Sequence, residues 1–99
     1  MDNAISAALA ALAHPARLAI LRTLSHGDCC CGDVVARLDL AQSTVSQHLR
    51  VLVEAGLVRY TPESRRSLYS LDRDRMNALA SDIGALVSTC CRNTEGSKT

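Results

Sequence analysis

The sequence predicts a mainly α-helical domain with one small β-hairpin. Apolar residues recur three and four positions apart along most of the chain, which is typical of amphipathic helices. Between residues 57 and 71 the spacing changes to two, which is typical of strands. The 99 residues suffice for one domain with a modest core.

The composition limits both the core and the cellular location. Hydrophobic residues make up 47% of the chain, but Tyr60 and Tyr69 are its only aromatic residues. A core of small aliphatic side chains buries limited area, so we expect a second copy of the chain to complete it. No apolar run approaches the ~20 residues of a membrane span, and the first residues lack the pattern of a secretory signal. We therefore expect a cytoplasmic protein without a membrane partner.

The first part of the chain predicts three short helices. The first covers Asp2 to Leu12 and ends at His14-Pro15, because proline disfavours helical geometry in the preceding residue and suits the first turn of a new helix. The second runs from Pro15 to about Leu24, and the third from about Gly32 to Leu38. The first helix carries Ile5, Ala8, Leu9 and Leu12 on one side, and Ile5, Leu9 and Leu12 are expected to add to a dimer surface. The side chains expected to anchor the other two helices in the core are Leu18, Leu21, Leu24, Val34, Val35 and Leu38.

The stretch from Ala41 to Gly56 predicts a fourth helix with an unusual outer face. One side carries the apolar stripe Val45, Leu49, Leu52 and Val53, and Gly56 ends the helix. The other side carries hydroxyls and amides rather than paired charges, and such groups can meet base edges and phosphates in a major groove. A half-buried helix with a polar outside is the simpler alternative. The candidate DNA contacts are Gln42, Ser43, Thr44, Ser46, Gln47, His48 and Arg50.

The neighbouring segments favour the DNA-binding interpretation. The third helix, a tight turn at residues 39–41 and the fourth helix make a helix-turn-helix. Leu57–Thr61 and Ser67–Leu71 follow as strands joined by a basic turn, which makes a wing. Arg65 and Arg66 at its tip would meet a phosphate backbone or minor groove, although they could also merely solubilise a loop. The net charge of +1 is too small for general attraction to nucleic acid, so a local basic patch suits a specific duplex binder.

The last helix is expected from Asp72 to about Cys91. Its apolar residues Met76, Leu79, Ile83, Leu86 and Cys90 follow one another at spacings of 3 and 4, which indicates a narrow seam. Because the hairpin separates this helix from the fourth helix, which is expected to contact DNA, the seam is available to a partner chain. We expect a homodimer in which residues 1–91 form the domain and residues 92–99 a disordered polar tail.

Five cysteines form two clusters, Cys29–Cys31 and Cys90–Cys91. An odd number of mostly adjacent cysteines in a reducing cytosol predicts metal ligands or redox sensors rather than a disulfide framework. The alternative for each is a small buried hydrophobe. Cysteine at a helix N-terminus tends to have a lowered pKa, which favours the first cluster as a thiolate donor.

The remaining polar residues exclude one class of function. His14 and His26 are expected in turns rather than as ligands, whereas His48 is expected to support or contact the DNA backbone. There is no glycine-rich phosphate loop and no nucleophile with a base and an orienting group. We therefore expect neither an enzyme nor an organic cofactor.

Two segments resemble a known family. Leu40-Ala41-Gln42-Ser43-Thr44-Val45-Ser46-Gln47-His48-Leu49 and His14-Pro15-Ala16-Arg17-Leu18-Ala19-Ile20-Leu21 are similar to signatures of the ArsR/SmtB metalloregulatory repressors. The resemblance covers roughly residues 8 to 72. It implies a dimeric winged-helix repressor that leaves its operator DNA when a ligand binds. Many members have serine where this chain has Ala41, so we expect a cap weaker by about 1 kcal/mol.

The resemblance also implies where an inducer binds. Arsenite-sensing members often carry Cys-Val-Cys-Asp, and the matching residues here are Cys30-Cys31-Gly32-Asp33, so Cys30 matches one ligand position and Gly32 removes another. Cys90 and Cys91 are similar to the vicinal C-terminal cysteines of members that sense As(III). The expected ligands are Cys30, Cys90 and Cys91, with Cys29 or Cys31 as alternatives to Cys30. The zinc-sensing pattern is absent, because Asp82 has no histidine after it.

Thiolates favour soft, thiophilic ions, and As(III) and Sb(III) accept three sulfurs in a pyramid. Cd(II) and Pb(II) remain open as inducers, and so does the choice between a site within one chain and one shared by two. Two other hypotheses remain. One is a thiol-redox or persulfide-sensing repressor of the same fold, and the other is a protein-interaction module that uses the last helix alone.

Overall fold

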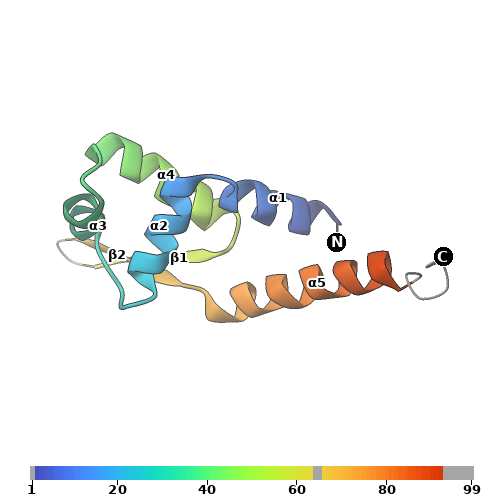
Figure 1. Cartoon of the computed structure of the whole chain (residues 1–99). Helices are drawn as coiled ribbons and strands as arrows, with labels where there is room; N and C mark the ends of the chain where they lie inside the picture. Colours follow the sequence, from blue (N-terminus) through green and yellow to red (C-terminus); the bar gives the residue numbers. More distant parts are fainter. Residues whose placement is uncertain (1, 64–65, 93–99) are drawn as a thin grey trace.

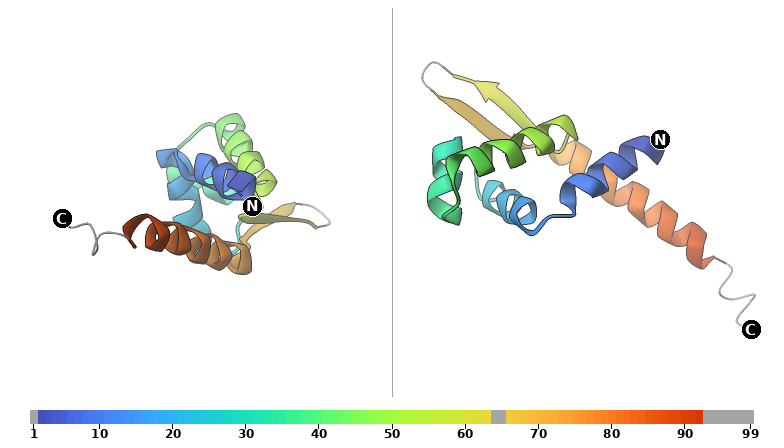
Figure 2. Two further views of the ribbon diagram at one scale, coloured as in Figure 1. Left: turned by 90° about the vertical axis from the view of Figure 1, so that its right-hand side faces the viewer. Right: turned by 90° about the horizontal axis from the view of Figure 1, so that it is seen from above.

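A computed structural model describes residues 2–63 and 66–92 (Figure 1). It confirms the predicted class, with five helices and an antiparallel two-stranded sheet. The helices α1–α4 pack around one core, while α5 runs beside α1 and extends beyond it (Figures 1 and 2). The elements are α1 Asp2–Leu12, α2 Pro15–Leu24, α3 Cys31–Leu38, α4 Gln42–Glu54, β1 Val58–Pro62, β2 Ser67–Leu71 and α5 Arg73–Cys91.

The core lies between α2, α3, α4 and the start of the hairpin. The predicted stripe of α4 is confirmed for Val45, Leu49 and Leu52, which are completely buried, whereas Val53 is partly buried against the core. Leu18, which was expected to face inward, is instead 37% exposed. The buried side of α2 is centred on Ile20, Leu21 and Leu24, and at 100° per residue Leu18 lies about 110° around the helix from that centre. The largest fully buried side chains are Ile20, Leu24, Val34, Val45, Leu49, Leu52 and Leu57.

Short local signals set the helix ends. The Nδ1 atom of His14 accepts a hydrogen bond from the Ala16 N–H at 3.2 Å and caps α2, as expected of a turn residue. Asp39 ends α3 in the left-handed conformation (φ 56°). Ala41 caps α4 without a side-chain hydrogen bond, which agrees with the weak cap predicted. Among the described residues, no single helix has the length and apolarity to cross a membrane, and α1 with α2 reaches them only as a pair bent by 92°.

The hairpin is fixed to α5 at its base. Its register pairs Val58 with Leu71 and Tyr60 with Tyr69. Asp72 accepts a hydrogen bond from the Arg75 N–H at 3.1 Å, which caps α5, and its Oδ2 atom lies 3.3 Å from Arg59 Nε. The Arg75 N–H first, and then Arg59, lower the pKa of Asp72, so this carboxylate is charged at neutral pH. The hairpin thus projects from the body of the molecule on an anchored base (Figure 2).

We expect Gly56→Ala to destabilise the protein by about 1–2 kcal/mol, because Gly56 has a positive φ of 84° that L residues rarely adopt. An added Cβ would also meet the guanidinium of Arg75, which would have to move. Gly84→Ala is the matched control. A Cβ at Gly84 meets nothing within 4 Å, so this change in a helix interior should stabilise by up to about 1 kcal/mol. The free energy of unfolding in urea measures both, and equal values for the two variants would contradict the expectation.

Candidate DNA-reading surface and cysteine sites

The α3–α4 pair has the arrangement of a helix-turn-helix, and α4 presents its polar side to solvent. Since Val45, Leu49 and Leu52 are buried, the opposite side of α4 must face outward. Exposed side chains predicted to read DNA are Ser43, Thr44, Ser46, Gln47 and Arg50. Gln42 is also exposed, but at the first position of α4 and in line with the buried stripe. No charged partner is bonded to any of these side chains within the described residues. The surface is therefore free to receive a ligand.

The hairpin lies beside this surface. Ser46 and Arg50 of α4 and Tyr60 and Tyr69 of the hairpin line a hollow of about 450 Å³. The two tyrosine rings are 5.3 Å apart, and the Tyr60 hydroxyl accepts a hydrogen bond from Ser67 Oγ at 2.8 Å. The helix α4, which we call the reader helix, and the hairpin thus form the two walls of one concave surface.

Of the two arginines predicted at the hairpin tip, the structure describes one. Arg66 is exposed on this surface. Arg65 lies outside the described residues, as do residues 93–99 of the predicted tail.

His48 differs from the other predicted DNA contacts because it is half-buried. Its Nδ1 atom accepts a hydrogen bond from Arg17 Nε at 3.1 Å, and its ring centroid lies 4.5 Å from that of His14. Burial first, and then the charges of His14 and Arg17, lower the pKa of His48 below 6.5. The imidazole is therefore neutral at pH 7.

The sequence analysis did not identify Arg17. One signal was present, however, because Arg17 stands four and seven positions before Leu21 and Leu24, on the side of α2 that faces the core. A cation in such a position needs a polar partner.

Cys29 follows the alternative of a small buried hydrophobe, because only 4% of it is exposed. Its backbone forms an antiparallel bridge with Tyr69, with N–H···O distances of 3.1 and 2.8 Å. Cys29 precedes α3 rather than beginning it, so burial dominates and raises the pKa of its thiol. The expected lowering of pKa is therefore wrong for Cys29, whose role in the structure is to pack.

Cys30 and Cys31 are half-buried at the start of α3. The side chain of Asp33 accepts a hydrogen bond from the Cys30 N–H at 3.3 Å. The Sγ atom of Cys30 lies 4.0 Å from Nη1 of Arg66, whereas the Sγ atom of Cys31 lies 3.6 Å from Oγ of Ser46. One thiol thus contacts the hairpin and the other contacts the reader helix.

Cys90 and Cys91 are exposed at the far end of α5. The molecule is 60 Å long, and α3 and the end of α5 lie at its opposite ends (Figure 1). In the part of the chain that the structure describes, no three His, Cys, Asp or Glu side chains are grouped to hold a metal ion. Among these residues, the two cysteine clusters are therefore not brought together within one chain.

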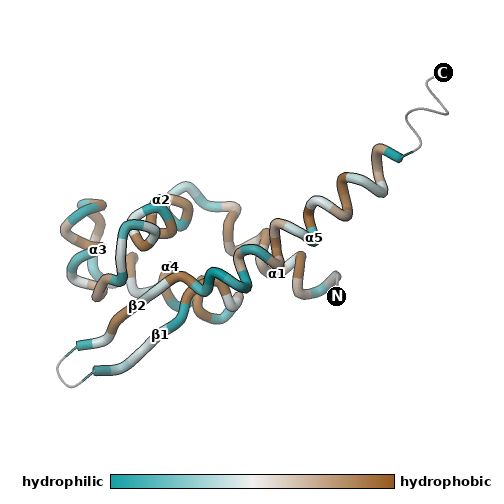
Figure 3. The backbone as a smooth tube through the Cα atoms, turned by 90° about the horizontal axis from the view of Figure 1, so that it is seen from below, coloured by the Kyte–Doolittle hydropathy of each residue, from teal (hydrophilic) through white to brown (hydrophobic). Residues whose placement is uncertain are grey.

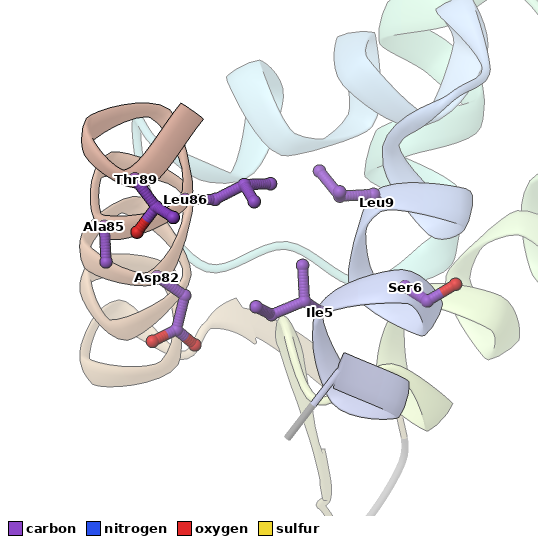
Figure 4. Close-up of a pocket in the computed structure, with 7 residues that line it drawn as sticks. All are labelled: Ile5, Ser6, Leu9, Asp82, Ala85, Leu86 and Thr89. Carbon is purple, nitrogen blue, oxygen red and sulfur yellow. The ribbon is translucent and has the colours of Figure 1, made fainter. Parts of the chain in front are cut away.

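An apolar groove of about 490 Å³ lies between α1 and α5. Ile5 and Leu9 point into it from α1 and Leu86 from α5 (Figure 4). Leu9 is 39% and Leu86 50% exposed, whereas Leu79 of the predicted seam is buried within the chain. Hydrophobic residues recur along α5 even where it extends past the other helices (Figure 3).

A helix-turn-helix with an exposed polar reader helix and an adjoining wing defines a DNA-binding transcriptional regulator. The chain belongs to the ArsR family: the model of "Bacterial regulatory protein, arsR family" matches residues 14–60, and a repressor at 41% identity is similar over most of the chain. It is also 41% identical to the biofilm growth-associated repressor of Agrobacterium fabrum, over 88% of this chain and 72% of that protein. The protein is thus a transcriptional regulator and not an enzyme.

Two further proteins are similar over most of their length. The arsenical resistance operon repressor of Staphylococcus xylosus is 27% identical over 90% of this chain and 89% of its own. The solved homodimeric winged helix-turn-helix domain of a possible ArsR-family regulator from Mycobacterium bovis superposes with a TM-score of 0.72 at 24% identity, covering 87% of this chain and 81% of that one. At this identity the second likeness shows the fold.

Proposed function

We propose that the protein is a homodimeric repressor that leaves its operator DNA when As(III) or Sb(III) binds its cysteine thiolates. The contact of Cys31 with Ser46 carries this proposal. An ion bound by Cys30 or Cys31 would act directly on the reader helix and on Arg66 of the hairpin. The arsenical resistance repressor among its relatives supports the choice of metalloid. The protein acts in the cytoplasm, where its operator lies.

The proposed reading mode places α4 in the major groove and the hairpin on the backbone. Hydroxyl and amide groups of α4, such as Ser43, Ser46 and Gln47, contact base edges or phosphates. Arg50 and Arg66, with Arg65, neutralise phosphates on either side. In a twofold dimer, two such surfaces read half-sites about one DNA turn apart.

The proposed dimer forms through α1 and α5. The groove that Leu9 and Leu86 line needs an apolar cover, and a second copy of the chain would supply one. The similar domain from Mycobacterium bovis is homodimeric. Such an interface draws Cys90 of the same seam toward the partner chain. This arrangement supports a three-sulfur site built from two chains.

In that site, Cys90 and Cys91 of one chain meet Cys30 or Cys31 of the other. Cys91 projects about 100° away from Cys90 around the helix, so the last turn of α5 must unwind for both to bind one ion. Binding of the ion links the helix-turn-helix of one chain to α5 of its partner. The protein leaves the DNA if, in this linked state, the two reader helices no longer match the spacing of the two half-sites. The ion must favour that state by a few kcal/mol.

A second candidate is a repressor that senses thiol oxidation or persulfides. It is favoured by the exposure of both Cys90 and Cys91. The name of a 41% identical relative, the biofilm growth-associated repressor, does not mention arsenic. Forming a disulfide removes two electrons and therefore needs an oxidant, whereas metalloid binding does not. Release of operator without an oxidant separates the two candidates.

Replacing Gln47 with alanine is expected to relax sequence preference, because a lost base contact costs about 1–3 kcal/mol of discrimination. The measurement compares the Kd for operator with that for scrambled duplex at one salt concentration. Asn77→Ala, which removes an exposed amide from α5, is the matched control and should change neither value. Unchanged affinities of the Gln47 variant for both duplexes would remove Gln47 from the reading surface.

A further inference from the structure

Arg17 of α2 contacts two other helices, the preceding α1 and the more distant α4. Its Nε atom donates to Nδ1 of His48 in α4 at 3.1 Å. Its Nη1 atom lies 3.4 Å from the carbonyl oxygens of Ala10 and Ala11, which belong to the last turn of α1. A guanidinium at the end of a helix bonds carbonyls that have no partner within it. One α2 side chain thus connects the end of α1 with the side of the reader helix.

The contact also determines which hydrogen-bonding group His48 presents. Arginine has donors only, so the ring nitrogen that faces it must be an unprotonated acceptor. In a neutral imidazole the proton then resides on Nε2, which becomes a donor. A donor on the reader helix suits the acceptor oxygens of phosphates and the acceptor atoms of base edges.

The bond requires a neutral His48. The titratable and charged groups that face this ring are His14, before α2, and Arg17 of α2. Both oppose a positive charge on the ring, and a protonated Nδ1 can no longer accept from Arg17. Protonation of His48 therefore breaks the link between Arg17 and α4.

We propose that Arg17 is a positioning residue for operator recognition, which orients α4 and holds His48 with its proton on Nε2. This inference rests on the reading of operator by α4 proposed above. Arg17 does not itself touch DNA in this arrangement; it acts through His48. Because α1 also lines the groove proposed as the dimer interface, Arg17 links that interface to the reader.

The test measures the Kd for operator of four folded proteins at about pH 8, namely wild type, Arg17→Ala, His48→Ala and the double variant. Arg17→Ala should weaken binding about tenfold, the size of a lost hydrogen bond to a charged group. Arg22→Ala removes an equal charge from an exposed position of the same helix and should change the Kd less than about twofold. Because Arg17 acts through His48, the double variant should bind no more weakly than His48→Ala alone.

Repeating the measurement at a lower pH, at which NMR shows the His48 ring to be protonated, gives a readout that a merely structural role would not move. The ratio of Kd values between Arg17→Ala and wild type should fall from about ten toward one, because acid breaks the bond in the wild type as well. Circular dichroism checks folding. If Arg17→Ala does not fold, Arg17→Lys replaces it, since lysine keeps the charge without the rigid fork of donors.

Two results would overturn the inference. One is an additive loss in the double variant, and the other is a Kd ratio that stays the same once the His48 ring is protonated. A different result is expected if α4 does not read the operator at all. In that case Gln47→Ala would also leave the preference for operator over scrambled duplex intact.

Discussion

A repressor carrying Cys90→Ser and Cys91→Ser is expected to bind operator like the wild type but to remain bound when As(III) is added. Both thiols lie at the end of α5, far from the reader of their own chain, so their loss should spare DNA binding. Without them, the proposed site keeps too few sulfurs to hold the ion. The wild type should lose affinity by about 5- to 150-fold on binding metalloid, the usual range of allosteric coupling.

Fluorescence anisotropy of labelled operator, with fully reduced protein and no oxidant, measures this difference. X-ray absorption of the wild type should show about three sulfur neighbours and no nitrogen. Release only after an oxidant is added would favour the redox-sensing candidate instead. Full induction in the double variant would rule out the C-terminal cysteines as ligands.

Single substitutions in the first cluster provide the controls. Cys30→Ser should lose induction as well, because Cys30 is half-buried beside Arg66. Cys29→Ala should keep induction, since Cys29 is buried beneath the hairpin. If induction survives in Cys30→Ser, Cys31 is the ligand to test next, because it contacts the reader through Ser46.

Leu86→Asp is expected to produce monomers that bind operator about 10²–10⁴-fold more weakly, because the two half-sites would no longer be bound by one dimer. Leu86 suits this test better than Ile83 of the same seam. Leu86 is 50% exposed within the chain, so its substitution acts on the interface, whereas Ile83 packs against the core of its own chain. A carboxylate placed in a buried apolar interface is strongly unfavourable.

Sedimentation measures the assembly and a titration of operator measures the affinity. Ser81→Asp is the matched control, because it adds the same charge at an exposed position on another side of α5 and should leave the dimer intact. A wild-type chain that sediments as a monomer at micromolar concentration would contradict the proposed dimer.

The order and ends of the elements followed from the sequence because local chemistry controls them. His14-Pro15, Asp39 and Gly56 interrupt helices through their own backbone preferences, and the structure places the breaks there. The outward face of α4 was equally predictable, because helical periodicity fixes which side chains oppose a buried stripe. These features depend on residues no more than a few turns apart.

Only the tertiary structure decided which side chains meet across the fold. Cys31 contacts a serine 15 positions away, and Arg17 a histidine 31 positions away. Cys29 is buried by a bridge to Tyr69 that no pattern around Cys29 indicates. The distance between the two cysteine clusters likewise could not be predicted from the sequence, because it depends on the direction that α5 takes after the hairpin. Periodicity specifies the face of a helix, but the partner of that face depends on how the helices pack, and packing is a property of the whole chain.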